Sequence, residues 1–441
     1  MSRHLRQVAG HVLPLFILLW VAGCGGGDGV SAGGDKAANA AGTDYTIGGK
    51  VSGLSGTVVM QNNGANDLSL SVNSAFAFTT ATVTGGNYSV TVLTHPAEQI
   101  CAVANGAGTV SGANVTDVTV TCSSSLPPAS LALFAGDMGS SGNVDGVGAA
   151  ARFNGPSDMA TDSAGNIYAA DFLNSTIRKI TPAGAVTTLA GTGGRGSADG
   201  IGTAASFFLP QGVATDGADN VYVSDTHNNT IRKIAPGGLV TTLAGTPGGN
   251  GSADGTGAAA SFVFPQGMAT DSAGNIYVAD NENNAVRKIT PAGVVTTFVG
   301  VAAHLILPTS VATDSADNVY VASGGDYTIR KVTPAGLVTT LAGSGAVGST
   351  DGTGIAASFN FPSGVAVDST GNVYVADSGN HTIRKIAPDG AVSTVVGVAG
   401  QAGFAPGALP GLLNSPASVA VSGTSLYVTL PNGVAVVKNR P

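Results

Sequence analysis

The chain is poor in charged and aromatic side chains. Asp, Glu, Lys and Arg make up 10% of its 441 residues, aromatic residues make up 5%, and the formal net charge is −8. Binding to a phosphate backbone requires clustered Lys and Arg, which the sequence lacks, so we expect no nucleic acid among its partners. The 66 glycines follow no triplet period, which excludes collagen. The Val, Ile, Thr and Tyr between them favour many short strands joined by tight turns.

Long apolar runs are also scarce, and the clearest one lies near the N-terminus. The run VLPLFILLWVAG follows the basic segment MSRHLR and ends directly before Cys24. It is too short for a stable membrane span and is typical of a signal peptide. One interpretation of this segment is an ordinary signal peptide, in which the cysteine that follows has no special role.

The VAGC ending resembles the lipobox of bacterial lipoproteins. The resemblance implies removal of residues 1–23, acylation of Cys24, and anchoring in the bacterial cell envelope through the N-terminal lipid. Gly25 follows the cysteine, and by the same resemblance this favours the outer membrane. Residues 24–44 are rich in Gly and Ala and are predicted to form a flexible tether.

Cysteine is rare, with three in the whole chain. An odd number in an exported protein requires an explanation. If Cys24 carries lipid, Cys101 and Cys122 remain to form a disulfide in an oxidising compartment. The bond would close a loop of roughly 20 residues and stabilise the fold by about 3 kcal/mol.

Residues 45–124 alternate apolar and polar residues between turn signals, in segments such as YTIGGKVSG and NYSVTVLT. About seven such segments predict a small antiparallel β-sandwich. It resembles the Ig-like or prealbumin-like modules that bacterial surface proteins use as spacers. Residues 125–129 are predicted to be a linker.

Residues 130–441 are repetitive. One Tyr recurs at intervals of 43 to 55 residues, and each interval contains four predicted strands, which is the content of a propeller blade. The recurring positions are Tyr168, Tyr222, Tyr277, Tyr320, Tyr374 and Tyr427.

The segment VYVADSGNHTIRKI resembles the NHL repeat, because Asn380 and His381 precede TIRKI. The resemblance implies an all-β, six-bladed NHL-type β-propeller. The last unit has three strands, and Ser130–Gly136 is predicted to supply the fourth, so that strands from both ends close the ring. An open solenoid of the same units is the alternative.

Residues that recur from unit to unit are interpreted as structural residues that maintain the fold of each repeat. The Arg-Lys pair on the third strand of five units should bury its aliphatic stems between blades and pair its charged groups with carboxylates. The connections that contain Asp-Gly are interpreted as tight turns. Structural calcium is the alternative cofactor, although each loop offers one carboxylate where calcium prefers several.

Residues that differ between units are the candidates for a ligand face. One set follows the Pro that opens each unit, and a second set lies in the loops on the same face. These residues form a polar, mildly aromatic rim that suits a peptide, a glycan or a small molecule. The candidates are Ser157, Asp158, Gln211, Gln266, Thr309, Ser363, Arg195, His227, Glu282, His304, Tyr327 and His381.

Two functions are compatible with this pattern. The first is a monomeric, non-catalytic envelope protein that binds a protein, peptide or glycan and needs no cofactor. The second is a secreted propeller lyase or lactone-type hydrolase with a divalent metal at the channel mouth. His227 and His381 belong to units on opposite sides of the ring, which disfavours a shared metal. The repeat region 130–441 also contains no serine nucleophile elbow, and the sequence contains no HExxH motif.

Overall fold

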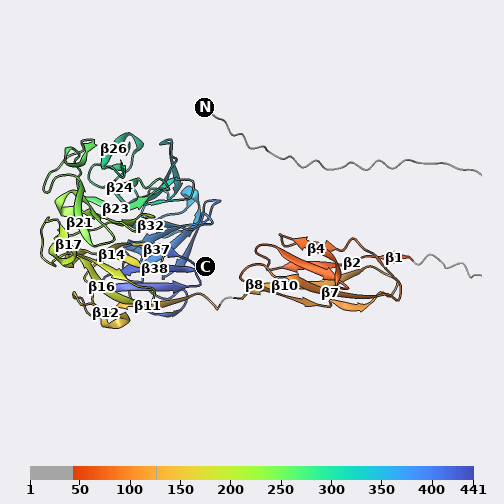
Figure 1. Cartoon of the computed structure of the whole chain (residues 1–441). Coiled ribbons are helices and arrows are strands. Elements are labelled where there is room, and N and C mark those ends of the chain that lie inside the picture. The colour runs from red at the N-terminus through yellow and green to blue at the C-terminus, as the bar shows by residue number, and fades with distance from the viewer. Residues whose placement is uncertain (1–42, 126) are drawn as a thin grey trace, which may run out of the picture. The chain divides into compact units, whose positions relative to one another are not determined.

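The computed structural model of the chain describes residues 43–125 and 127–441. Contacts divide the chain into two compact units, Met1–Ser125 and Leu126–Pro441, and each is described by itself (Figure 1). Strands and short 3-10 turns form all the regular structure of the described residues. None of their helices is long and apolar enough to cross a membrane.

Three predictions fall outside the described part of the chain. These are the signal peptide 1–23, the lipidation site Cys24 and the tether up to residue 42. They remain predictions.

The first unit contains two four-stranded sheets and one two-stranded sheet around a shared apolar core. One sheet has the order β5-β2-β10-β8 and the other the order β4-β3-β7-β9. Val58, Met60 and Val118 are fully buried in the core. The strands are β1 (Asp44–Tyr45), β2 (Ile47–Ser52), β3 (Val58–Asn62), β4 (Ala65–Leu70), β5 (Ala75–Ala77), β6 (Thr82–Val83), β7 (Asn87–Thr94), β8 (Gln99–Ala104), β9 (Ala107–Thr109) and β10 (Val115–Ser124).

One pairing in this unit differs from the expected antiparallel pattern. Strands β2 and β10 run parallel. They pair in space but are far apart in the sequence, and no hairpin joins them. No short turn therefore imposes the antiparallel direction on this pair.

The predicted disulfide is confirmed. Cys101 on β8 is bonded to Cys122 on β10, and the two residues are directly opposite each other in this antiparallel pair. Both are buried in the core, so the covalent link connects two neighbouring strands of one sheet.

The described residues of the second unit form six antiparallel sheets of four or five strands, a content typical of a β-propeller. We number the sheets 1 to 6 along the chain. In sheets 1 to 5 the four main strands follow one another as a meander. Sheets 1 to 3 consist of β13 (Pro156–Thr161), β14 (Ile167–Asp171), β15 (Thr176–Ile180), β16 (Ala185–Ala190); β18 (Val213–Thr215), β19 (Val221–Asp225), β20 (Thr230–Ile234), β21 (Leu239–Ala244); β23 (Pro265–Thr270), β24 (Ile276–Asp280), β25 (Ala285–Ile289) and β26 (Val294–Val299).

Sheet 6 combines strands from distant parts of the chain. Strand β11 pairs antiparallel with β39, with Leu131 opposite Val437, and so becomes the fourth main strand (Figure 1). The first strands of successive sheets contact each other, and β37 contacts β13, which completes the circle. Sheets 4 to 6 consist of β27 (Pro308–Thr313), β28 (Val319–Ser323), β29 (Thr328–Val332), β30 (Val338–Ala342); β32 (Pro362–Val367), β33 (Val373–Asp377), β34 (Thr382–Ile386), β35 (Ala391–Val396); β37 (Val419–Ser422), β38 (Ser425–Leu430), β39 (Gly433–Lys438) and β11 (Ser130–Gly136).

The connections between sheets add a short fifth strand to every sheet except sheet 4. Each leaves the outer strand of one sheet, and its two-residue strand pairs with the outer strand of the next sheet. In sheet 4 the connection is shorter and this strand is absent among the described residues. The short strands are β12 (Gly146–Val147), β17 (Gly200–Ile201), β22 (Gly255–Thr256), β31 (Gly352–Thr353) and β36 (Gly407–Ala408).

A buried ion-pair network recurs in sheets 1, 2, 3 and 5. In sheet 5 the fully buried Arg384 donates from Nη1 to Asp377 Oδ2 at 2.9 Å and from Nη2 to Asp351 Oδ1 at 2.6 Å. Its guanidinium carbon lies 5.2 Å from the centroid of the Phe359 ring. The equivalent arginines are Arg178, Arg232 and Arg287.

This network corrects the interpretation of the Asp-Gly connections as turns alone. Asp351 accepts from an arginine 33 residues further along the chain and from the Thr394 hydroxyl. Its carboxylate therefore attaches the connection to the sheet that follows. In sheet 4, where the second strand ends in Ser323, Arg330 pairs instead with Asp326 at 2.9 Å.

Candidate functional site

A left-handed residue precedes the proline that opens each sheet. Phe264 has φ +52° and Phe361 has φ +55°, a conformation that is uncommon for large side chains. The chain reverses there and directs the next two residues toward the axis of the ring. The six residues in this position are Gly155, Leu209, Phe264, Leu307, Phe361 and Ser415.

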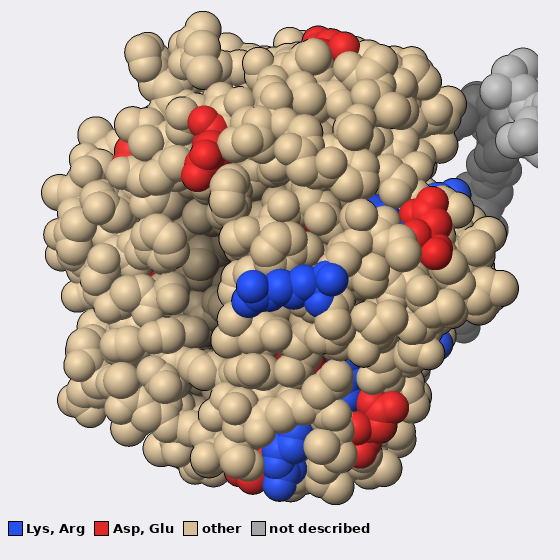
Figure 2. Space-filling view, turned by 90° about the vertical axis from the view of Figure 1, so that its left-hand side faces the viewer, with Lys and Arg blue, Asp and Glu red and all other residues tan. Residues whose placement is uncertain are grey.

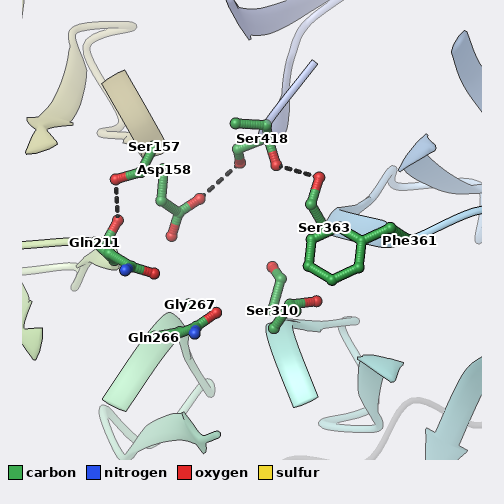
Figure 3. A pocket seen from close by; sticks show the side chains of 11 residues that line it. Ser157, Asp158, Gln211, Gln266, Gly267, Ser310, Phe361, Ser363 and Ser418 are labelled. Carbon is green, nitrogen blue, oxygen red and sulfur yellow. Dashed lines mark hydrogen bonds between the residues drawn. The ribbon is translucent and has the colours of Figure 1, made fainter. Parts of the chain in front are cut away.

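The residue after each proline lies at the mouth of the central channel, as the repeat spacing predicts. All six of these residues line one cavity of about 310 Å³ (Figure 3). They come from six different sheets and comprise two serines, two glutamines, one threonine and one alanine. They are Ser157, Gln211, Gln266, Thr309, Ser363 and Ala417.

Three of these side chains connect neighbouring sheets. The hydroxyls of Ser157, Thr309 and Ser363 donate to the backbone oxygens of Gln211, Pro362 and Ala417 at 2.8, 2.9 and 2.7 Å. These three hydroxyls therefore stabilise the ring as well as lining the cavity.

The two glutamines of the cavity differ from these hydroxyl residues because their side chains do not connect neighbouring sheets. The side chains of Gln211 and Gln266 form no hydrogen bond with any described residue, and Figure 3 shows both carboxamides extended toward the open centre. Each carboxamide offers two donors and an acceptor. They are the polar groups in the cavity that are most accessible to a ligand.

Asp158 supplies the only carboxylate among the residues that line this cavity. Its Oδ1 accepts from Ser418 Oγ at 2.6 Å and its Oδ2 accepts from the amide of Val213 at 3.2 Å. Desolvation raises the pKa of Asp158 to about 6, although these hydrogen bonds oppose the shift. The group therefore changes charge within the range of mildly acidic solutions.

Small residues occupy the equivalent of Asp158 in the other sheets. At Gly212 an added Cβ would collide with the backbone oxygen of Gln266, because the first strands approach closely around the channel. Ser310 and Ser418 occupy this position in sheets 4 and 6 and also line the cavity.

The structure adds Phe361, Ser310 and Ser418 to the predicted cavity residues. Phe361 is 50% exposed, and its ring points into the cavity in Figure 3. A sequence signal for the two serines was present, since they occupy the same repeat position as Asp158. Phe361 could have been found from its position directly before the proline.

The remaining candidates do not line this cavity. His227, in η4 (Thr226–Asn228), lies among the rings of Phe208 and Phe264, each with its centroid 5.0 Å away. Arg195 lies over Phe208, with 5.2 Å between the guanidinium carbon and the ring centroid. Burial and the nearby Arg195 cation lower the pKa of His227, which favours its neutral form.

The other four occupy separate loops. Tyr327 and His381 have positive φ values of 58° and 61° at the ends of their turns, and His381 Nδ1 accepts from the amide of Ser415 at 3.0 Å. His304 ends η6 (Val301–Ala303) and is exposed, as is Glu282. The predicted separation of His227 and His381 onto different sheets is observed.

Within residues 43–125 and 127–441, no three His, Cys, Asp or Glu side chains are placed to hold one metal ion. The Asp-Gly carboxylates of sheets 1, 2, 3 and 5 are used by the buried arginines. The cavity itself combines one carboxylate, two carboxamides, five hydroxyl side chains and one aromatic ring. This set can hydrogen-bond a polar ligand and contact an apolar part of it.

The sequence matches the NHL repeat at residues 262–289 and 359–386. The matched segments fall in sheets 3 and 5 and contain the first three strands of each. The chain thus contains NHL repeats within an all-β, propeller-like fold. Among curated proteins it is similar to Protein SUPPRESSOR OF QUENCHING 1, chloroplastic, from Arabidopsis thaliana, with 38% identity over 94 residues. That match covers 21% of this chain and only 9% of the length of the relative.

Several solved structures share the fold. A protein of unknown function from Bacteroides thetaiotaomicron is 18% identical with a TM-score of 0.57, covering 87% of this chain and 90% of that one. An auxiliary nutrient binding protein from Bacteroides ovatus is 15% identical with a TM-score of 0.55, covering 89% and 97%. A virginiamycin B lyase from Staphylococcus aureus is 14% identical with a TM-score of 0.41, covering 63% and 80%. At such identities the likeness of the two Bacteroides proteins concerns the fold alone, and the lyase, with its lower TM-score, carries no argument.

Proposed function

We propose that this protein is a lipid-anchored binding module of the bacterial cell envelope. In this proposal the six sheets are the blades of a closed NHL β-propeller, and the first unit is an Ig-like or prealbumin-like sandwich that acts as a spacer. Cys24 carries the lipid, the outer membrane is the location, and the protein is a monomer. A peptide, protein or glycan binds at the channel mouth without chemical conversion.

The observation that carries the proposal is the chemistry of the cavity. Of the six residues that follow the prolines and line one space, five are polar, and the carboxamides of Gln211 and Gln266 have no partner among the described residues. Unpaired amide groups in a concave site are suited to recognising a ligand through hydrogen bonds. The similar Bacteroides ovatus protein is an auxiliary nutrient binding protein, which agrees with this role.

The alternative is a propeller lyase or lactone hydrolase that uses a divalent metal. Such an enzyme would need several carboxylates or histidines at the mouth. The cavity contains the single carboxylate of Asp158. The binding function is therefore favoured.

Binding is tested with the lipid-free chain from residue 25 and a library of envelope glycans and peptides, screened with and without divalent metal. We expect at least one ligand to bind unchanged, and Gln211→Ala with Gln266→Ala to weaken it. Asp219→Asn, at an exposed carboxylate between β18 and β19 and outside the cavity, is the matched control. Conversion of a library member that depends on added metal would support the enzyme instead.

Anchoring is tested in cells by metabolic labelling with a fatty acid. We expect label in the full chain and none in Cys24→Ser. Equal labelling of both forms would contradict the lipoprotein assignment and leave the binding function intact.

A further inference from the structure

An aromatic cluster lies on the turns of sheets 1 to 3. The ring of His227 is 5.0 Å from Phe208, 5.0 Å from Phe264 and 6.4 Å from Phe172, measured between centroids. All four side chains are half-buried, so part of each ring remains accessible to solvent. We name these four residues, together with Arg195, the aromatic platform.

The platform is not required by the repeating frame. The position of Phe208 carries Asn154 in sheet 1 and Asn360 in sheet 5. The position of His227 carries Leu173 and Gly379 in the same two sheets. Because those sheets form the same strands with other side chains at these two positions, the fold does not require Phe208 or His227.

Arg195 differs from every other arginine in the described residues. Residues 43–441 contain eight arginines, and the other seven each form an ion pair with an aspartate. Arg195 is exposed, its guanidinium lies over Phe208, and no described residue accepts a hydrogen bond from it. Equivalent positions in the other long connections carry Ser141, Asn250 and Val347.

The guanidinium of Arg195 is thus held by an aromatic face while its N–H groups remain free. A planar guanidinium binds a carboxylate with two parallel hydrogen bonds. Figure 2 shows that charged side chains are few on the face that it presents, so an unpaired cation is a distinctive feature of such a surface.

The platform adjoins the channel mouth. Phe264 directly precedes Pro265 and Gln266, and Gln266 lines the cavity. Thr226, the neighbour of His227, donates to the backbone oxygen of Pro265 at 2.7 Å and fixes the two segments together. A ligand in the cavity can therefore extend onto the platform.

We propose that the platform binds a sugar ring that carries a carboxylate, as part of an acidic oligosaccharide whose neighbouring hydroxyls reach Gln211 and Gln266. A pyranose ring has an apolar C–H face that fits against aromatic rings, and the carboxylate pairs with Arg195. The inference rests on the proposed binding function and names the ligand class. An acidic peptide or an aromatic carboxylate offers part of this chemistry but does not combine a stacking ring with repeated hydroxyls for the carboxamides.

The test uses the lipid-free chain and isothermal titration with tetragalacturonate. The matched ligand is its methyl ester, which keeps every ring and removes the charge. We expect the acid to bind about tenfold or more tightly than the ester, the effect of one charge-assisted pair. In Arg195→Gln the preference disappears, and in Arg195→Lys it is restored only in part. In Phe208→Leu both ligands bind more weakly, because the aromatic face is lost while the volume is nearly kept.

Lys438→Gln removes an exposed positive charge from β39 and is the control for general electrostatics. We expect this variant to prefer the acid over the ester by the same factor as the wild type. Equal affinity for acid and ester, or an unchanged preference in Arg195→Gln, overturns the inference. Tighter binding of an acidic peptide or of phenylacetate at the same residues also overturns it. If Gln266→Ala abolishes binding of a library ligand while Arg195→Gln leaves it unchanged, the binding function stands and this inference fails. Absence of binding by every probe overturns it as well.

Discussion

Asp158 Oδ1 accepts a hydrogen bond of 2.6 Å from Ser418 Oγ, although the two residues stand 260 positions apart. Asp158 lies on the first strand of sheet 1, and Ser418 directly precedes the first strand of sheet 6. The bond therefore crosses the junction at which the ring closes. Because Asp158 is also the only carboxylate lining the cavity, the charge of the cavity and the closure of the ring depend on the same group.

This arrangement predicts a pH-dependent stability. Desolvation raises the pKa of Asp158 from 3.8 to about 6, so the folded chain binds this proton more tightly than the unfolded chain. The resulting stabilisation is full below about pH 4 and is lost as the pH rises through 6. Relative to Asp158→Asn, the free energy of unfolding of the wild type should fall by at most about 3 kcal/mol across this window.

The measurement is urea denaturation of both proteins from pH 4 to 7. Glu282→Gln, which removes an exposed carboxylate, should follow the wild-type curve. A difference between wild type and Asp158→Asn that is constant with pH would contradict the prediction.

The buried arginines predict a large loss from a single substitution. Arg384→Met leaves the carboxylate of Asp377 buried without its cation, and removing one partner of such a pair costs about 3–5 kcal/mol. We expect a matching fall in the free energy of unfolding, measured by denaturant titration. The double variant with Asp377→Asn should recover part of it, because the unpaired charge is gone.

The neighbouring Lys385 supplies the control. Its Nζ donates to the backbone oxygen of Pro441 at 3.1 Å in an exposed position, so Lys385→Met should cost less than about 1 kcal/mol. Similar losses in the two single variants would show that burial of the ion pair is not the cause.

Local periodicity was enough to predict the strands and the cavity positions of the second unit. Ser157, Gln211 and Gln266 follow prolines at regular spacing, and a repeat that places one of them at the channel places them all. The Cys101–Cys122 bond followed from counting cysteines.

Contacts between distant residues were not predictable in this way. The local sequence around Asp351 predicts only a turn residue. Its partner Arg384 is 33 positions away, and no local sequence pattern connects the two residues. The same holds for Asp158 and Ser418, and for the aromatic rings around His227, which come from three sheets. Such partners depend on how neighbouring sheets are placed, which spacing within one repeat does not encode.

The disulfide predicts a loss confined to the first unit. Replacing Cys101 and Cys122 with alanine removes a link between residues 21 positions apart, which stabilises by about 3 kcal/mol in the chain-entropy model. Hydrogen exchange resolved by mass spectrometry should show faster exchange in β8 and β10 and unchanged exchange in β14 and β33. Equal acceleration in both units would contradict the division of the chain.

The pairing of β11 with β39 predicts that the stability of the ring depends on β11, the first strand of the second unit. Leu131 is 1% exposed and packs with Leu413, Val428 and Val437, so Leu131→Ala should cost about 2–5 kcal/mol, measured by denaturant titration. Leu337→Ala, at a side chain that is 63% exposed, should change stability by less than about 0.5 kcal/mol. A chain that begins after Gly136 would leave the edge of β39 unpaired, and light scattering should then detect association, because an open edge pairs with other chains. A truncated chain that stays monomeric and as stable as the wild type would show that β11 does not close the ring.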